Sequence, residues 1–346
     1  MKRYLTIILL TLIFFSCQPK YTPRVINKVE IETFKIENSS IRAIVGVNEE
    51  TVYFAGSNGK LGNTKDAGKT WSIETISYQD SIQPHFRSMS KTNDGVFALS
   101  IANPALLYKI NDDKKIVYTE NHEKVFYDSM HFFENEKDGI AVGDPTENCP
   151  SIIITNDGGN SWTKIPCSEL PKFEDGEAFF AASNTNIKIL GNTVWIGSGG
   201  KKARILKSTD KGKSWEIYTT PVIQGNGPQG IYSIDFYDEN TGIVIGGDYS
   251  KPEDNCKNKA ITIDGGKTWT VIADNENPNY KSCVQFVPGG KGKEIVTVGK
   301  TGISYSNDGG TTWKELSKES FYSIQFVNNT TAWLSGNEKI ARLKLM

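Results

Sequence analysis

Short apolar runs, most of them closed by a glycine, recur along the chain between polar, turn-rich segments. The clearest run from Val52 to Gly56, Ile140 to Gly143, Val194 to Gly197, Ile243 to Gly246, Ile295 to Gly299 and Ala332 to Gly336. Runs this short, bounded by turn residues, predict β-strands. No long apolar stripe with a period of 3.6 residues follows residue 16, so the pattern predicts an all-β fold and argues against an α/β one.

One eight-residue pattern occurs five times among these runs as Ser/Thr-x-Asp-x-Gly-x-Ser/Thr-Trp, and we call each copy an octapeptide. Its Asp can accept hydrogen bonds from the backbone N–H groups of a tight turn, and its Gly can take a positive φ angle. The hydroxyls can close the turn, while the Trp begins the returning strand and buries a large ring beside it. The octapeptides therefore predict five hairpin turns, whose Asp and Trp residues are Asp66 and Trp71, Asp157 and Trp162, Asp210 and Trp215, Asp264 and Trp269, and Asp308 and Trp313.

The spacing of the octapeptides predicts a propeller. Their Asp residues lie 91, 53, 54 and 44 positions apart, and a period of about 45–50 residues is typical of a blade of four short strands. The interval of 91 corresponds to two periods, so we expect a degenerate turn near position 112. Asn111 to Lys115 lies there, between two apolar runs.

The two ends of the chain predict how the ring closes. After Ala332 to Gly336 the chain offers only one more strand, Lys339 to Leu345, so a seventh unit lacks its fourth strand. Val29 to Ile36 can supply that strand, which would remove the free edges of an open sheet. We therefore expect residues 29–346 to form a single domain, a seven-bladed β-propeller of four-stranded blades closed by an N-terminal strand.

An alignment of seven candidate innermost strands supports this count. Strands that crowd around one axis need small side chains, and small residues fill one row of the alignment. That row is Ala43, Ser88, Ser129, Ala181, Ser233, Cys283 and Ser323.

The first 28 residues predict export and membrane attachment. Lys2 and Arg3 precede an apolar run from Leu5 to Phe15 that is too short to span a bilayer. Phe14 to Cys17 resembles a bacterial lipobox, which implies a signal peptide over residues 1–16, a lipidated Cys17 and a polar tether over residues 17–28. The mature chain would then lie in the cell envelope, on the outer membrane facing the periplasm. An ordinary secretory signal, with Cys17 lost or unmodified, is the alternative.

The net charge and the cysteines limit the partners, disulfides and metal sites that the chain can have. The net charge is -1, and removal of residues 1–16 with Lys2 and Arg3 lowers it to -3, so we expect no nucleic-acid partner. Export permits disulfides, and the four later cysteines allow three connectivities. The hairpin around Asp157 sets Cys149 opposite Cys167, which favours this bridge, and a bridge between Cys256 and Cys283 would join neighbouring units. Without Cys-x-x-Cys spacing or clustered histidines, we expect no metal site and no cofactor.

The octapeptides look like Asp-boxes, also called BNR repeats, which occur in sialidases, sortilin-type receptors and photosystem II assembly factors. Over residues 29–346, the order of strand, Gly, octapeptide and Trp most resembles the photosystem II assembly factor-like bacterial propellers. In such families the box lies on the blade rim, away from the ligand face, so the resemblance implies a fold and assigns no catalytic residue. Sialidases have six blades, three substrate-binding arginines and an Arg-Ile-Pro motif. The segment His85-Phe86-Arg87-Ser88 lacks the Ile-Pro, and only five arginines follow the signal, so sialidase activity is not expected.

The face opposite the octapeptide turns carries the longest loops, and loops on a rigid scaffold often hold binding residues. Asp144 and Asp248 each follow a strand-ending glycine, Asp128 begins an inner strand and Glu177 precedes another. The candidate ligand-binding residues of this face are Asp128, Asp144, Glu177, Arg204, Asp248 and Tyr249.

Two interpretations of these residues stay open. In the first, they surround the channel mouth and bind a polar ligand such as a glycan, a peptide or a cation. In the second, Asp144 and Asp248 cap turns, and the charged side chains of the loops are solvated. The first predicts a binding or assembly scaffold for an envelope protein or polar ligand. The alternative function is an envelope enzyme, glycoside hydrolase-like or of other chemistry, that uses paired carboxylates for acid–base work.

Overall fold

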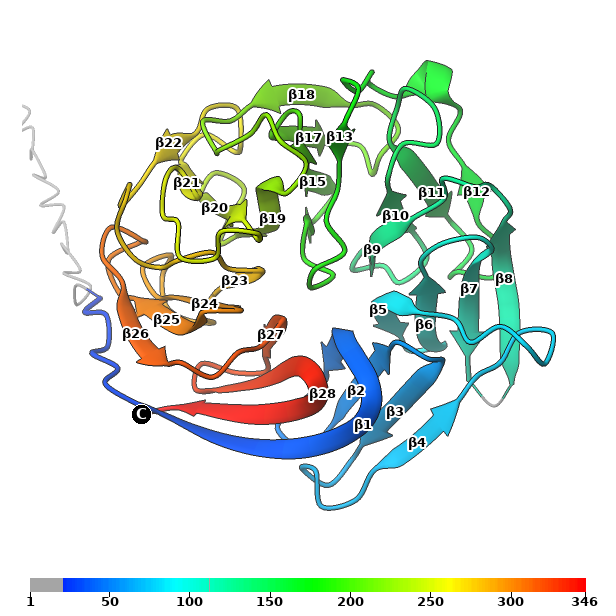
Figure 1. Ribbon diagram of the computed structural model, residues 1–346, viewed down its shortest axis with the longest axis horizontal. Coiled ribbons are helices and arrows are strands. Elements are labelled where there is room, and N and C mark those ends of the chain that lie inside the picture. The colour runs from blue at the N-terminus through cyan, green and yellow to red at the C-terminus, as the bar shows by residue number, and fades with distance from the viewer. Residues whose placement is uncertain (1–20, 112) are drawn as a thin grey trace, which may run out of the picture.

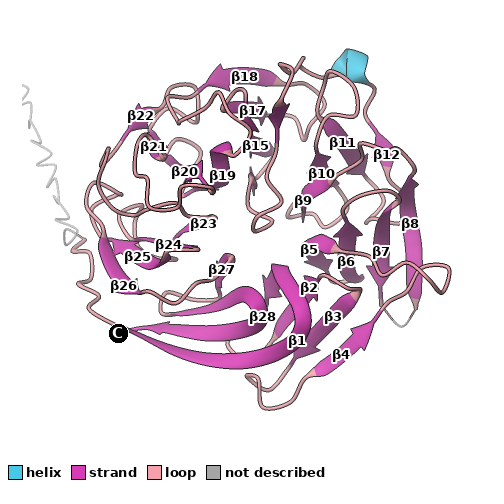
Figure 2. Cartoon of the chain, viewed as in Figure 1, coloured by secondary structure: helices cyan, strands magenta, loops and turns pink. Residues whose placement is uncertain are grey.

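The computed structural model describes residues 21–111 and 113–346, and these form a ring of β-sheets around a central axis (Figure 1). In this range η1 (Cys167–Glu169) is the one helical turn (Figure 2), and no helix has the length and apolar character to cross a bilayer. The prediction of an all-β propeller is confirmed. The predicted signal peptide, the predicted lipidation site Cys17 and the residue at position 112 lie outside the described residues.

The described strands form six hydrogen-bonded sheets, so the prediction of seven blades is wrong. The first and last predicted units are not separate sheets, because the long strands β1 (Val29–Gly46) and β28 (Thr331–Leu345) pair with each other and join them. We call the joined unit the closing sheet. Its order is β27-β28-β1-β2-β3-β4, with β27 (Ser323–Phe326), β2 (Val52–Gly56), β3 (Lys60–Thr64) and β4 (Ser72–Thr75).

The other five sheets follow in chain order around the ring, and we name each by its strands. The β5–β8 sheet contains β5 (Phe86–Thr92), β6 (Gly95–Ser100), β7 (Ala105–Ile110) and β8 (Lys114–Glu120). The β9–β12 sheet contains β9 (Tyr127–Phe132), β10 (Gly139–Gly143), β11 (Ser151–Thr155) and β12 (Thr163–Lys164). The β14–β18 sheet contains β14 (Ile187–Leu190), β15 (Thr193–Gly197), β17 (Arg204–Ser208) and β18 (Glu216–Thr219).

The last two sheets complete the ring. The β19–β22 sheet contains β19 (Gln229–Phe236), β20 (Gly242–Asp248), β21 (Lys259–Thr262) and β22 (Thr270–Val271), and the two-residue strands β16 (Gly199–Gly200) and β13 (Glu177–Ala178) extend it beside β19. The β23–β26 sheet contains β23 (Cys283–Phe286), β24 (Ile295–Gly299), β25 (Gly302–Ser306) and β26 (Lys314–Ser317).

The pairing of the two chain ends is confirmed. In the closing sheet Val29 pairs with Leu345, and the antiparallel register continues to Lys35 opposite Lys339. Figure 1 shows β1 and β28 running side by side from the ring's edge to its centre. In an open, linear array the first and last strands would each have an edge without hydrogen bonds. This pairing gives both of them a partner.

Each octapeptide closes its hairpin through its own side chains. In the first, the Thr64 hydroxyl donates to Asp66 Oδ1 at 2.8 Å and accepts the N–H of Gly68, whose φ is +89°. Asp66 also accepts the N–H and the hydroxyl of Thr70, and these bonds lower the pKa of its carboxyl to about 2. The turn is therefore fixed locally, as the spacing predicts.

The indoles of four octapeptides seal seams between neighbouring sheets. Trp162 packs with Phe97 of the preceding sheet, and Trp269 packs with Trp195 in the same way. Trp215 and Trp313 fill the corresponding positions at two further seams, while Trp71 lies within the closing sheet between Phe34 and Phe54. The repeat thus joins each of these sheets to the one before it.

The first of the two expected disulfides is present. Cys149 and Cys167 are bonded with their Cα atoms 5.7 Å apart, beside the β11–β12 hairpin. A bridge between Cys256 and Cys283 is not formed, because both are free cysteines, Cys283 buried on β23 and Cys256 on the loop before β21. That expectation is wrong because one cysteine lies inside a sheet and the other on a loop.

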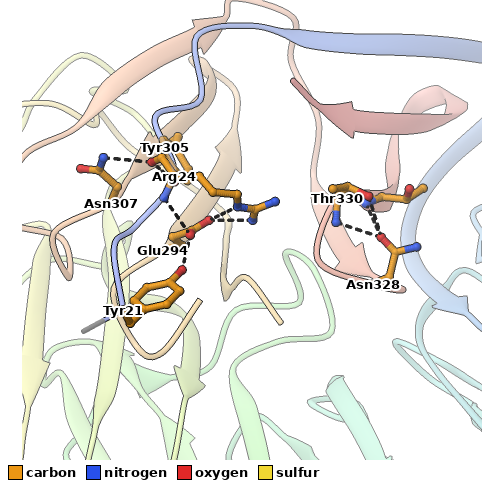
Figure 3. Close-up of polar contacts among 8 residues, drawn as sticks. Tyr21, Arg24, Glu294, Tyr305, Asn307, Asn328 and Thr330 are labelled. Atoms are coloured by element: carbon orange, nitrogen blue, oxygen red, sulfur yellow. Dashed lines mark hydrogen bonds and ion pairs between the residues drawn. The ribbon is translucent and has the colours of Figure 1, made fainter. Parts of the chain in front are cut away.

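Residues 21–28, expected to be a polar tether, pack against the β23–β26 sheet (Figure 3). Arg24 makes two hydrogen bonds to Glu294 Oε2, at 2.8 and 2.6 Å, and Tyr21 donates to the same carboxylate. The backbone oxygen of Arg24 accepts from Tyr305 and from Asn307, while Ile26 is buried at the seam with the closing sheet. The described part of the expected tether is therefore packed against the ring.

A second kind of turn joins the inner strands of several sheets. In the closing sheet, Asn328 Oδ1 accepts the N–H groups of Thr330 and Thr331 at 2.8 and 2.7 Å (Figure 3). Asn48, Asn135 and Asp238 accept in the same way before β2, β10 and β20. Such Asx turns hold the end of the ring that carries the octapeptides.

Candidate functional site

The centre of the ring is filled by a loop, residues 179–186, that we call the plug. Figure 1 shows this green segment leading from β13 into the middle of the ring. The inner-strand alignment was wrong here, because Ala181 lies in the plug and the innermost strand of this sheet is β14. The plug therefore occupies the space in which an open channel would lie.

Hydrogen bonds join the plug to the inner strands around it. Asn184 donates to the Met89 oxygen at 2.8 Å and accepts the N–H of Met130 at 2.9 Å. Ser183 donates to Ser282 O and accepts from Ser323, and Thr185 shares a hydrogen bond with Ser233. Because partners come from β5, β9, β19 and β27, the plug is fixed from several sides.

Two arginines hold the outer end of the plug. Nη1 of Arg42 donates to the oxygen of Ala182 and Nη1 of Arg87 to that of Ala181, both at 3.2 Å. The buried Nε atom of each has no acceptor. The other described arginines each form an ion pair with a carboxylate, and Arg42 and Arg87 do not. Those ion pairs belong to Arg24, Arg204 and Arg342.

The surroundings of the two arginines disfavour their charged form. Burial lowers the pKa of Arg42, and burial together with the nearby Arg42 charge lowers the pKa of Arg87 to about 10. Both guanidinium groups are therefore charged at neutral pH, close together and without a carboxylate in ion-pairing distance. An anion that reached them would find an electropositive site in a partly dry environment.

Aromatic rings surround this pair of arginines. The Arg42 guanidinium lies over the Tyr322 ring, 3.9 Å from its centre. Phe180 of the plug stacks on Tyr232 at 3.9 Å, and Tyr280 meets Tyr232 edge-on. We call the surface made by Arg42, Arg87, Phe180, Tyr232, Tyr280 and Tyr322 the mouth.

Asp128 and Asp144, predicted at an open channel mouth, serve the interior instead. Asp144 Oδ1 accepts the N–H of Phe179 at 2.7 Å, which fixes the start of the plug, and burial raises its pKa to about 6. Asp128 is fully buried with no hydrogen-bond partner at either oxygen. Burial, and after it the Asp144 charge, raise the pKa of Asp128 well above its usual range.

Glu177 and Arg204 form a buried ion pair. Arg204 makes a two-pronged contact, Nε to Oε1 at 2.9 Å and Nη2 to Oε2 at 2.6 Å, and a further bond to the oxygen of Lys172. Ser198 also donates to Glu177. The pair fixes the loop before the plug and has little capacity left for a ligand.

Of the two interpretations drawn from the sequence, Asp248 fits the turn cap and Tyr249 fits an exposed binding residue. Asp248 caps a turn, because its Oδ1 accepts the N–H and the hydroxyl of Ser250. Burial acts to raise its pKa, but these bonds lower it overall. Tyr249 is 53% exposed and meets Tyr232 edge-on, so it extends the aromatic part of the mouth to the surface.

No family model and no curated protein sequence matches the chain. Solved structures do match it, and they show the propeller fold. The structure entitled "YCF48 bound to D1 peptide" has a TM-score of 0.63 at 14% identity and covers 94% of this chain and 98% of its own. YCF48 from Cyanidioschyzon merolae gives 0.62 at 14%, covering 91% and 98%. The RRP9 WD40 repeats give 0.64 at 12%, covering 91% and 97%.

Sequence reasoning missed Arg42 and Arg87 as site residues, although a signal for them is present. In the inner-strand alignment each stands directly before the small residue of its row, as do Asp128, Tyr232, Ser282 and Tyr322. These residues lie on, or directly before, inner strands of five of the sheets and meet around the plug. In the described ranges no group of three or more His, Cys, Asp or Glu side chains is placed to hold a metal ion.

Proposed function

We propose that the chain is a binding scaffold whose mouth holds a carboxylate-bearing segment of a protein partner. The observation that carries this proposal is the pair Arg42 and Arg87, two guanidinium groups without a carboxylate partner, fixed on consecutive plug carbonyls. A half-buried cation without a counter-ion is costly, and a ligand carboxylate would supply the charge-assisted hydrogen bonds that are missing.

The aromatic part of the mouth supports a protein partner over a free anion. Tyrosine and arginine are enriched at the energetic centres of protein interfaces. Tyr322 lies against Arg42, and Tyr249 contacts Tyr232, which stacks on Phe180 of the plug. The matching fold of a YCF48 structure solved with a D1 peptide, and of WD40 repeats, supports the same class of function. The octapeptides and strand order support a place among the Asp-box propellers, most like the photosystem II assembly factor-like ones.

The proposed setting is the cell envelope, with the chain exported and held by a lipid on Cys17. Residues 21–28 then matter for orientation, because Arg24 binds Asn307 of an octapeptide. The mouth lies at the other end of the strands, where Arg42 follows Ile41, the partner of Gly56 at the end of β2. A chain anchored through Cys17 would therefore present its mouth away from the membrane.

The enzyme alternative receives no support from the carboxylates predicted for it. Asp128 is enclosed, Asp144 holds the plug and Glu177 is paired with Arg204. Acid–base chemistry on a glycoside needs two carboxyl groups that reach the same substrate bond. These three are used by the fold.

A capture experiment with the purified full chain tests the proposal. The double variant Arg42→Gln/Arg87→Gln should lose the envelope proteins that the wild-type chain retains, while Arg342→Gln, a matched change at an arginine paired with Glu32, should keep them. Captured partners should be released by a peptide with a free C-terminal carboxylate and not by its amide. Retention of the same partners by a double variant with an unchanged melting temperature would reject the proposal.

A further inference from the structure

The seam between the closing sheet and the β5–β8 sheet differs from the four seams that an octapeptide indole seals. The missing octapeptide belongs after β7, and there Ile110 at the end of β7 pairs with Lys114 at the start of β8. Ile110 stands opposite Val96, as Thr155 stands opposite Gly139 and Thr262 opposite Gly242. Ile110 therefore takes the place of the first octapeptide hydroxyl, and β8 continues without a tryptophan.

The inner-strand side chain at this seam also differs from those at the seams that an indole seals. Gly139 and Gly242, which stand opposite those octapeptide hydroxyls, pair on their other side with Phe132 in the β9–β12 sheet and Phe236 in the β19–β22 sheet. Each of these rings packs against its octapeptide indole, at 5.6 and 6.1 Å between centroids. In the β5–β8 sheet the equivalent residue is Lys91, which pairs with Val96.

A cavity of about 450 Å³ lies where the indole would be. It is lined on the closing sheet by Tyr53, Phe54 and Asn63, and on the β5–β8 sheet by Lys91, Val96 and Asn111. By register, Tyr53 corresponds to Trp195, the residue of a preceding sheet on which Trp269 packs. The cavity thus keeps the aromatic wall of an indole site and lacks the indole.

The seam between the β23–β26 sheet and the closing sheet also has no octapeptide indole, and it shows what covers such a place. There residues 21–28 of the chain itself lie across the seam, with Ile26 buried and the oxygen of Arg24 bonded to Tyr305. Tyr305 stands directly before the first octapeptide hydroxyl, as Asn63 does in the closing sheet. At this seam, a segment of polypeptide rather than solvent covers the position that an octapeptide indole would fill.

We infer that the cavity between Tyr53 and Lys91 is a second binding site, which takes a tryptophan side chain from a segment of a partner protein. The Lys91 ammonium, held by the Thr92 oxygen at 3.0 Å, replaces a phenylalanine edge with a cation, which the electron-rich face of an indole complements. Asn63 and Asn111 provide amide groups for the backbone of the incoming segment. The site is independent of the mouth and of the function proposed for it.

The test uses the full chain and an acetylated, amidated peptide with the sequence of Ser306 to Trp313 that carries 5-fluorotryptophan. Fluorine NMR should show saturable binding of this peptide and none of its Trp-to-Ala form. Lys91→Phe, which restores the phenylalanine of the other sheets and fills the cavity, should weaken binding at least tenfold and raise the melting temperature. Lys213→Phe, the same change at an exposed octapeptide position, should leave binding unchanged.

Two results would overturn the cavity as a tryptophan site. One is an absence of binding to the wild-type chain at millimolar peptide, and the other is equal binding by wild type and Lys91→Phe. Binding of N-acetyltryptophanamide as tight as that of the peptide would also reject a protein segment as the occupant. Lys91→Ala, which leaves the cavity open, should bind the peptide and guards against loss of binding through misfolding.

Discussion

Replacing Asp144 with Asn should remove a pH-dependent weakness from the fold. Asp144 Oδ1 accepts the Phe179 N–H at the start of the plug, and an asparagine oxygen can accept the same bond. Burial raises the pKa of Asp144 from 3.8 to about 6. The native state therefore binds more protons than the unfolded state between about pH 4 and pH 6, so the free energy of unfolding falls as the pH rises through this window.

The size of the effect follows from the shift. About two pKa units correspond to about 3 kcal/mol, of which roughly 2.5 kcal/mol develops between pH 4 and pH 7.5. Urea unfolding of both proteins at these two pH values measures it, and Asp144→Asn should gain this amount relative to wild type on going to pH 7.5. The Asp128 carboxyl interacts with Asp144, so the titration observed is that of the two carboxyls together.

A second aspartate provides the control. Burial acts to raise the pKa of Asp210, but hydrogen bonds from Ser214 lower it to about 2. Its titration lies below the window, so the difference between wild type and Asp210→Asn should change little from pH 5 to pH 7.5. A wild-type to Asp144→Asn difference that is the same at pH 4 and pH 7.5 would refute the burial of this carboxyl.

Two further predictions concern stability. Trp162→Ala should lower the free energy of unfolding by roughly 3–5 kcal/mol in urea titrations, because the ring is 7% exposed at the seam with Phe97; a loss under about 1 kcal/mol, as at an exposed site, would contradict that packing. Cys149→Ser/Cys167→Ser should cost about 3 kcal/mol, since the bridge closes a sequence separation of 18 residues, and reduction of the wild type should produce the same loss.

The parts of the fold that the sequence predicted are those fixed by local chemistry. An octapeptide contains both the donors and the acceptors of its turn, as the bonds between Thr64, Asp66 and Thr70 show, so its structure can be inferred from eight residues. Strand closure was predictable because Val29 to Ile36 had no other partner. The number of sheets was not, because nothing in the sequence shows that β1 and β28 run on through two predicted units and merge them.

The candidate site was harder to predict because its residues satisfy one another across the ring. Glu177 and Arg204 were both selected as ligand-binding residues, yet each is the other's partner. Asp144 was chosen for its place after a glycine, and its acceptor oxygen is taken by Phe179. A polar residue on a loop face can bind a ligand only if the fold leaves it unpaired, and that depends on contacts far apart in sequence, such as those of the plug.

The plug also explains why arginine suits the carboxylate site proposed for the mouth. Each guanidinium spends one Nη–H on a plug carbonyl, and its planar fork has further donors for a carboxylate. A lysine ammonium could bind the same carbonyl, but as a flexible point charge it would present no fixed pair of donors. Because Asn184 and Ser183 fasten the plug to β5 and β27, the guanidinium groups are ordered before a ligand arrives. The ordering entropy of two long side chains, about 0.5–1.5 kcal/mol each, is then not lost on binding.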